Sequence, residues 1–140
     1  MIRAIIVDFN GLIADDETPN LRGTPIEQSV AIIVSADDCA IGNPNPAMYR
    51  YTMKLLNTQE PRPPLVRAGE DLVVEDSLAG IQSTNAAGMI ALALSTIYSA
   101  EKLGEADHIL PRLEGITPEA VFRALAANRP PTPYRDNPSR

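Results

Sequence analysis

The sequence has little basic charge, a single cysteine and no long apolar segment. Twelve Lys and Arg residues stand against 18 Asp and Glu, which gives a formal net charge of -6 and a pI near 4.7. Because neutralising nucleic-acid phosphates requires clustered basic side chains, this balance argues against nucleic-acid binding. Cys39 has no second cysteine to pair with, so we expect a partly buried thiol and a reducing, cytoplasmic environment.

The first residues also lack the apolar region of a signal peptide. Ile5 to Val7 are apolar, but Asp8 follows at once, so we expect neither secretion nor insertion into a membrane. A length of 140 residues and an apolar fraction of 44% are ordinary for one globular domain, whereas 13 prolines and no tryptophan are less usual. The predicted organisation is one core, residues 1–128, followed by a proline-rich C-terminal tail, residues 129–140.

Four short apolar runs predict strands. In chain order they are residues 5–7, 30–34, 72–74 and 89–94. Nearly continuous apolar runs of this length are typical of strands that are covered on both faces of a parallel sheet. Helix patterns lie between them, so the sequence predicts an α/β fold: a Rossmann-like three-layer sandwich with a parallel sheet and right-handed crossovers.

The predicted helices have recognisable ends. Asn45 and Pro46 would be the N-cap and first residue of a helix through about residue 56. Ser77 would cap a helix that Gly88 ends, and a last helix is expected over residues 117–127. Packing inside the first helix accounts better than ligand binding for Met48, Tyr49, Tyr51 and Met53. His108 is expected on a strand, at an edge or partly buried.

Acidic residues follow two of the apolar runs. Asp8 ends the first run, and Glu75 and Asp76 end the third. Ligands of open parallel sheets bind at the carboxyl ends of the strands, so three carboxylates converge there if these strands are neighbours. Such hard oxygen ligands suit Mg²⁺. On spacing alone, a Mg²⁺ site and a set of solvated acids that cap helices and loops are equally compatible with the sequence.

Longer segments around these acids resemble motifs of the haloacid dehalogenase-like (HAD) superfamily. The strand that enters Asp8-Phe9-Asn10-Gly11 is similar to its first motif, Asp-x-Asp-Gly. Residues 73–89 resemble its fourth motif, in the branch of phosphoglycolate phosphatases and β-phosphoglucomutases. Residues 35–46 resemble the segment with the third-motif lysine, and residues 106–110 resemble the final strand.

The resemblance implies a phosphohydrolase in which Asp8 attacks a phosphoryl group and forms an aspartyl-phosphate. It also implies a Mg²⁺ ion held by Asp8, the backbone carbonyl of Asn10 and Asp76, with Glu75 bound directly or through water. The implied phosphate-binding positions are Gly11, Ser35 and Asn43. Ser35 would stand in for the second motif; alternatively, the run before it is a later strand and the second-motif strand is deleted.

The sequence departs from the family at two of these positions. Position 10 is normally an aspartate that transfers protons, which the amide of Asn10 cannot do, and losing such catalysis should raise the barrier by about 3 to 5 kcal/mol. Asn43 replaces the lysine that offsets phosphate charge, so phosphate should bind more weakly. The family's cap domain is also missing, because residues 15–28 form only a short polar loop, and the site should be open to water.

Two functions remain from the sequence. The first is a degenerate core, catalytically inactive or very slow, that is retained as a binding or structural subunit with a residual Mg²⁺ site. The alternative is a Mg²⁺-dependent phosphatase, so whether the chain is an enzyme stays open. A protein partner would bind the tail, residues 129–140, or the open active-site face, since extended proline segments bind at low entropic cost. An oligomer is compatible with the sequence.

Overall fold

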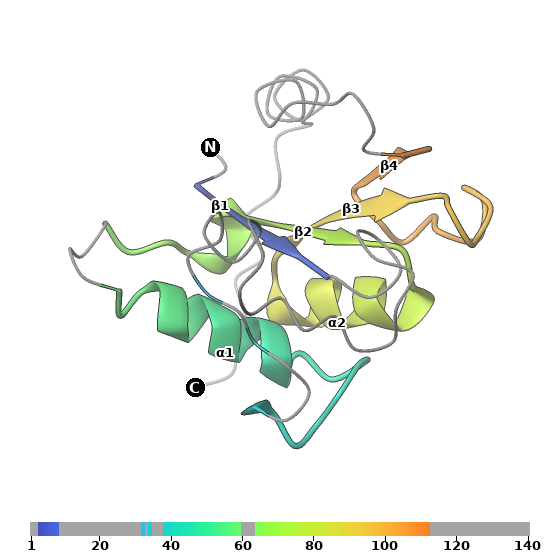
Figure 1. Cartoon of the computed structure of the whole chain (residues 1–140). Helices are drawn as coiled ribbons and strands as arrows, with labels where there is room; N and C mark the ends of the chain where they lie inside the picture. The colour runs from blue at the N-terminus through green and yellow to red at the C-terminus, as the bar shows by residue number, and fades with distance from the viewer. Residues whose placement is uncertain (1–2, 9–31, 33, 35–37, 60–63, 113–140) are drawn as a thin grey trace, which may run out of the picture.

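A computed structural model describes residues 3–8, 32, 34, 38–59 and 64–112. The elements of this part of the chain alternate between strand and helix (Figure 1). In order, they are β1 (Ala4–Val7), α1 (Ala47–Leu56), the 3-10 helix η3 (Ala68–Glu70), β2 (Asp71–Glu75), α2 (Leu78–Ala87), β3 (Ile90–Leu94) and β4 (His108–Leu110). The predicted α/β class is therefore confirmed.

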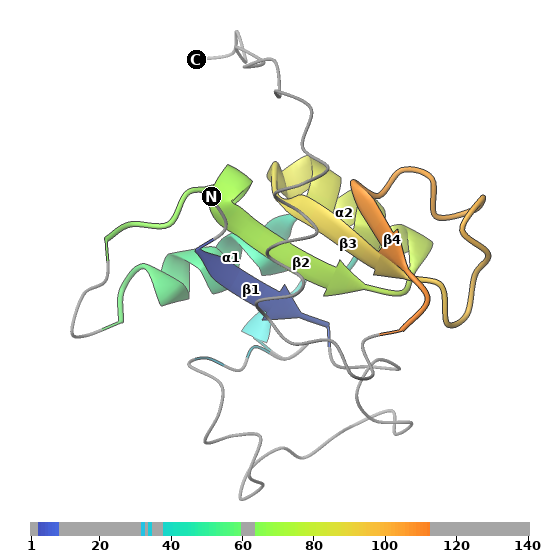
Figure 2. The ribbon, with the colours of Figure 1, turned by 90° about the horizontal axis from the view of Figure 1, so that it is seen from above.

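The four described strands form one parallel sheet in the order β1-β2-β3-β4. Val7 lies opposite Val74, and Glu75 lies opposite Ala93 in the next strand. Figure 2 shows the strands running in the same direction, with their carboxyl ends along one edge of the sheet. The strands that end at Asp8 and Glu75 are thus direct neighbours, which is the arrangement that makes a shared site at that edge possible.

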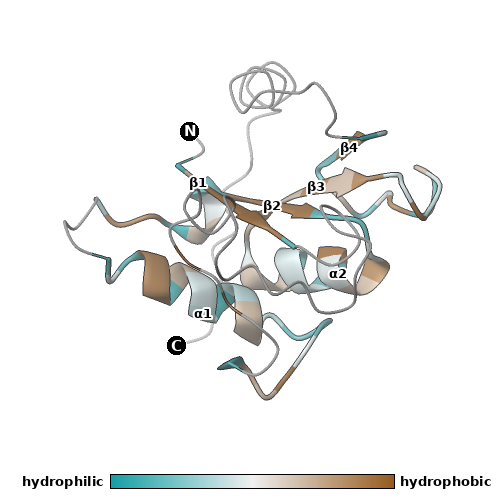
Figure 3. Ribbon diagram, in the orientation of Figure 1, coloured by the Kyte–Doolittle hydropathy of each residue, from teal (hydrophilic) through white to brown (hydrophobic). Residues whose placement is uncertain are grey.

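Helices α1 and α2 both cover the same face of the sheet (Figure 1). Alternate strand residues point to that face. Val73 packs there with Tyr49 and Met53 of α1, and Ala91 packs there with Ile81 of α2. Apart from Asp71 and Glu75 at the two ends of β2, the central strands are apolar (Figure 3), as expected for strands buried within a sheet.

The opposite face of the sheet carries its own apolar cluster. Leu72 and Val74 of β2 pack there with Leu92 and Leu94 of β3, and each of the four is at most 3% exposed. The remaining predicted helix, residues 117–127, lies outside the described residues. The third layer of the predicted sandwich therefore stays a prediction.

The helix ends agree with the sequence in one case and differ in the other. Ser77 is the N-cap of α2 and accepts a hydrogen bond from the Gly80 N–H, while Gly88 ends the helix with a φ of 77°. For α1 the prediction was wrong by one residue, because Pro46 is the N-cap. The Asn45 side chain still accepts a hydrogen bond from the Ala47 N–H, at 2.9 Å, so it binds the helix start from one position further out.

Several predicted segments fall outside the described residues. They include residues 15–28, where the cap domain is expected to be missing, and the tail at residues 129–140. Of the predicted strand at residues 30–34, Ile32 and Val34 are described, and neither is in a strand. No helix in the described part of the chain is long and apolar enough to cross a membrane.

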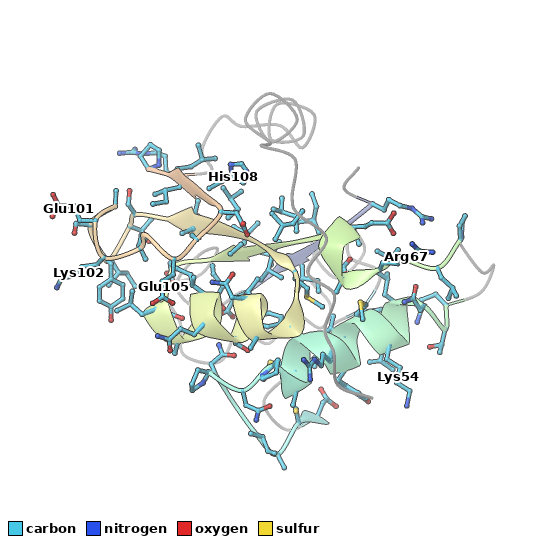
Figure 4. All side chains as sticks on the ribbon, turned by 180° about the vertical axis from the view of Figure 1, so that it is seen from behind. Lys54, Arg67, Glu101, Lys102, Glu105 and His108 are labelled. Atoms are coloured by element: carbon cyan, nitrogen blue, oxygen red, sulfur yellow. The ribbon has the colours of Figure 1, made fainter. Side chains whose placement is uncertain are left out.

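Charged side chains gather at the periphery of the described fold. Figure 4 shows Glu101, Lys102 and Glu105 in the connection between β3 and β4, and Lys54 near the end of α1, all pointing away from the sheet. In that view Glu101, Lys102 and Glu105 lie on one side of the fold, and Arg67 and Lys54 lie on the other.

Candidate metal and phosphate site

Asp8 lies where β1 ends, beside the end of β2. Its backbone N–H donates a hydrogen bond to the Val74 carbonyl oxygen at 3.1 Å, so the pairing of the two strands continues as far as this residue. The side chain is half-buried. Asp8 is therefore fixed by its backbone next to Glu75 and Asp76, as the sequence predicts from the strand ends.

Glu75 is the last residue of β2 and is completely buried. The Tyr49 hydroxyl donates a hydrogen bond to its Oε1 atom. Its Oε2 atom accepts hydrogen bonds from the Ser77 hydroxyl at 3.0 Å and from the Ser77 backbone N–H at 3.3 Å. Both oxygens are thus bound within the protein, because the side chain of Glu75 points to the face of the sheet that α1 and α2 cover.

Asp76 follows directly and is 4% exposed. Its Oδ2 atom is buried and has no hydrogen-bond partner among the described residues. A buried carboxylate oxygen without a partner is costly, and the cost falls if a proton or a cation binds there. Asp76 is therefore the residue of this edge that is best prepared for a positively charged ligand.

The electrostatics of the edge point the same way. Burial raises the pKa of Asp76, and the nearby charge of Asp8 raises it further. Burial is also the main cause that raises the pKa of Glu75, opposed by its hydrogen bond from Tyr49 and reinforced by Asp8. The pKa of Tyr49 is raised by burial first and by the Glu75 charge second. Its hydroxyl therefore stays protonated and acts as a hydrogen-bond donor.

These groups fit Mg²⁺ in their chemistry, though not as three converging carboxylates. No group of three or more His, Cys, Asp and Glu side chains in the described part of the chain is placed to hold a metal ion. Glu75 is turned toward Tyr49 and Ser77, which leaves Asp8 and Asp76 as the carboxylates at the edge. Mg²⁺ typically uses one or two carboxylates and fills its shell with water and phosphate oxygens. Direct binding by Glu75 stays a prediction.

The loop that bears Asn43 is held against α2. The Asn45 N–H donates to the Gly42 carbonyl oxygen at 3.1 Å, which closes a turn around Asn43. The buried Ser83 hydroxyl then donates to the Asn45 carbonyl oxygen at 2.7 Å. Asn43 itself is exposed. The position at which the sequence resemblance implies a lysine thus lies on a loop fixed by these hydrogen bonds.

The other predicted site residues cannot be located in the same way. Asn10, Gly11 and Ser35 lie outside the described residues, so their roles toward metal and phosphate stay predictions. His108 is partly buried on β4, at the far side of the sheet from β1, as expected for a residue without a catalytic role (Figure 4). Cys39 is partly buried, also as expected.

Tyr49 is the residue that the sequence reasoning missed. The expected packing of Tyr49 and Met53 on the helix is confirmed, but the hydroxyl of Tyr49 also contacts the acid of the predicted fourth motif. A buried tyrosine almost always has a partner for its hydroxyl. Pairing that rule with a buried acid at a strand end would have suggested Glu75, 26 residues away in the chain.

Comparison with known proteins supports this reading of the motifs. No protein-family model matches the chain. Over 86 residues, or 61% of its length, the chain is 34% identical to a validoxylamine A 7′-phosphate phosphatase of Streptomyces hygroscopicus subsp. limoneus, and the match covers 37% of that protein.

The fold is similar to those of solved HAD-family structures. For a β-phosphoglucomutase of Clostridium difficile the TM-score is 0.62 at 21% identity, over 76% of this chain and 43% of that one. For a conserved haloacid dehalogenase-like protein of Agrobacterium tumefaciens the TM-score is 0.53 at 27% identity, over 67% and 42%. The chain thus spans less than half the length of each of these three proteins. The predicted fold is confirmed, and these similarities support the resemblance to haloacid dehalogenase-like proteins.

Proposed function

We propose that this haloacid dehalogenase-like core is a degenerate phosphohydrolase core, inactive or very slow, that retains a Mg²⁺ site and serves as a binding or structural subunit. One observation carries the proposal: Asp8 and Asp76 end neighbouring parallel strands, and the Oδ2 atom of Asp76 is buried without a partner among the described residues. This pair would hold the metal together with the backbone carbonyl of Asn10. Bound Mg²⁺ would offset negative charge at the site.

Asp8 is the residue that would react. Its carboxylate oxygen would attack phosphorus, the bond from phosphorus to the leaving oxygen would break, and the leaving oxygen would take up a proton. Water would later hydrolyse the aspartyl-phosphate and regenerate the carboxylate. The fixed backbone of Asp8, bound to Val74, supports a defined direction of attack.

Two asparagines make this reaction slow. The amide of Asn10 can neither give a proton to the leaving oxygen nor take one from water, which costs about 10²- to 10⁴-fold in rate. Asn43 brings no positive charge to a site whose carboxylates, Asp8 and Asp76, are already negative. Metal binding needs neither side chain, so we expect the chain to bind Mg²⁺ even though its turnover is very slow or absent.

The alternative function is an active Mg²⁺-dependent phosphatase that works through the aspartyl-phosphate. The observation that favours it is the 34% identity to a phosphatase whose name gives validoxylamine A 7′-phosphate as its substrate. A small phosphomonoester would be the substrate class in that case. Leaving groups that need no proton would react best, because Asn10 supplies none.

In the subunit function, a partner protein would bind the open active-site face or the tail at residues 129–140. The tail contains prolines that favour an extended conformation, together with Tyr134 and several arginines. Extended proline segments lose little entropy on binding. A comparison of partner capture by the full chain and by a chain ending at residue 128 separates the tail from the open face.

The test of activity uses the full chain with Mg²⁺ and acetyl phosphate, whose leaving group needs no general acid. Wild type, Asp8→Ala, Asn10→Asp and the double variant Asn10→Asp/Asn43→Lys are assayed side by side. We expect wild type to stay near the Asp8→Ala background. With a second substrate, an alkyl phosphomonoester whose leaving oxygen needs a proton, the Asn10→Asp variant should gain about 10²- to 10⁴-fold, and the double variant should also bind phosphate more tightly.

Two outcomes contradict the proposal in different ways. Wild-type turnover as fast as that of Asn10→Asp, and lost in Asp8→Ala, would exclude the degenerate core and leave the active phosphatase. A double variant that stays inert, although folded, would mean that the site is not a phosphohydrolase site altered at two positions.

A further inference from the structure

Tyr49 brings α1 into contact with the end of β2. Its ring packs in the apolar cluster with Val73 and Met89, and the residue is only 4% exposed. The hydroxyl at the end of this ring donates to the Oε1 atom of Glu75, which is fully buried. A buried hydroxyl and a buried carboxylate each need a partner, and here each provides one for the other.

The hydrogen bonds continue from Glu75 into the first turn of α2. The second carboxylate oxygen accepts from the Ser77 hydroxyl and from the Ser77 backbone N–H. The Ser77 hydroxyl oxygen in turn accepts from the Gly80 N–H at 2.9 Å. One connected set of hydrogen bonds therefore runs from Tyr49 in α1, through Glu75 at the end of β2, to the N-terminus of α2.

The space that this carboxylate occupies is defined by a missing side chain. A β-carbon at residue 80 would overlap the carboxyl carbon and both oxygens of Glu75. Gly80 thus leaves room for the carboxylate, Tyr49 binds it from one side, and Ser77 binds it from the other. The position of Glu75 is determined by three elements at once, which is typical of residues that support a functional site.

Asp76 is the residue held between these anchors. Its neighbour on one side is Glu75 and its neighbour on the other is Ser77, and those two are joined through the Glu75 carboxylate. Asp76 has its buried Oδ2 atom without a partner among the described residues. The turn is therefore fixed on both sides of Asp76, whose buried Oδ2 atom lies at the carboxyl end of β2.

We propose that Tyr49 is a positioning residue of the Mg²⁺ site: by binding Glu75, its hydroxyl fixes the turn that presents Asp76 beside Asp8. This inference rests on the proposed function, since it concerns the same metal site. Tyr49 acts on the metal only through Glu75. Outer groups of this kind typically change metal affinity by about 10- to 100-fold when they are removed.

The experiment measures the dissociation constant of Mg²⁺ alone by calorimetric titration of the full chain. The variants are Tyr49→Phe, Glu75→Gln and the two combined. Tyr51→Phe is the matched control, because Tyr51 lies on the same helix but is 37% exposed. Far-ultraviolet circular dichroism and a urea unfolding curve show whether each variant is folded at the titration temperature.

We expect Tyr49→Phe to weaken Mg²⁺ binding about 10-fold and Tyr51→Phe to leave it unchanged. In the Glu75→Gln background, removing the Tyr49 hydroxyl should not weaken Mg²⁺ binding further, because Tyr49 acts on the metal site through the Glu75 carboxylate, which this variant lacks. A purely structural role would lower stability without this dependence on Glu75.

Each contrary result has its own meaning. A folded Tyr49→Phe variant that binds Mg²⁺ like wild type overturns the positioning role and leaves the proposed function standing. A wild type that binds no Mg²⁺ overturns both. If Tyr49→Phe does not fold, Ser77→Ala is the second variant, because it removes the opposite contact with the same carboxylate; unchanged Mg²⁺ affinity there also overturns the proposal.

Discussion

Gly80 approaches the carboxylate of Glu75 so closely that a β-carbon at residue 80 would overlap the carboxyl group. Glu75 cannot withdraw easily, because Tyr49 and Ser77 bind both of its oxygens. The glycine is therefore required here by close packing and not by its backbone conformation. A glycine within a helix destabilises it by about 1 kcal/mol relative to alanine. Gly80 is nevertheless needed in α2, because it leaves space for the Glu75 carboxylate.

The Gly80→Ala substitution should destabilise the protein in spite of the better helix former. We expect the free energy of unfolding to fall by about 1 to 3 kcal/mol, because a methyl group forced into a filled site displaces Glu75 and its partners. Urea unfolding measures this change. Gly42→Ala is the matched control, since nothing lies within 4 Å of a β-carbon there. Equal stability of the two variants would mean that the Glu75 carboxylate can move aside without a loss of stability.

Asp71, the first residue of β2, should make the stability depend on pH. It is fully buried, and neither carboxylate oxygen has a hydrogen-bond partner among the described residues. Burial, and then the charge of Glu70, raises the pKa of Asp71 from 3.8 to about 6. Because the folded state holds the proton more tightly than the unfolded state, this group favours folding below pH 4. That contribution is lost as the pH rises to about 6.

An Asp71→Asn variant cannot ionise at residue 71, so its free energy of unfolding should not fall for this reason as the pH rises. At pH 7 it should be more stable than wild type by about 1 to 2 kcal/mol, and at pH 4 the difference should be close to zero or reversed. Urea midpoints at pH 4, 5, 6 and 7 test both ends of the curve. Asp107→Asn is a poor control because that side chain binds the Ala91 N–H, so the exposed Glu101→Gln is used. A difference that does not vary with pH would contradict the raised pKa.

The sequence predicted the edge of the sheet on which the acids lie. Short apolar runs that end in Asp8 and Glu75 indicated it, because parallel strands place their carboxyl ends together. That prediction was conditional on the two strands being neighbours, and β1 does pair with β2. The start and end of α2 were also predictable, since Ser77 and Gly88 act through local backbone geometry. Local signals of this kind need no knowledge of the rest of the fold.

The direction of each side chain was not predictable in the same way. Glu75 and Asp76 are adjacent in sequence and both were expected at the metal site, yet Glu75 binds Tyr49 in the interior and Asp76 does not. That difference depends on a residue 26 positions away and on the space above Gly80. The one-residue error at the start of α1 has a related cause, because Asn45 uses its carbonyl oxygen to bind Ser83 as well as its side chain to bind the helix.

Ser83 should matter for phosphate binding although it is buried in α2 and carries no charge. Its hydroxyl holds the Asn45 carbonyl oxygen at 2.7 Å, and so keeps the turn around Asn43 in place. We expect Asn43→Lys to tighten the binding of inorganic phosphate in the presence of Mg²⁺, because a lysine there offsets anionic charge. In that background Ser83→Ala should remove part of the gain.

The expected size follows from one lost hydrogen bond. Losing about 1 kcal/mol of loop positioning corresponds to about fivefold weaker phosphate binding, and the free energy of unfolding should fall by a similar amount. Gln82→Ala is the control, since Gln82 is the exposed neighbour on the same helix and its loss should change stability by less than about 0.5 kcal/mol. If Ser83→Ala lowers stability but leaves phosphate affinity in the Asn43→Lys background unchanged, the loop does not need this anchor to present residue 43. A lysine there would then act by charge alone.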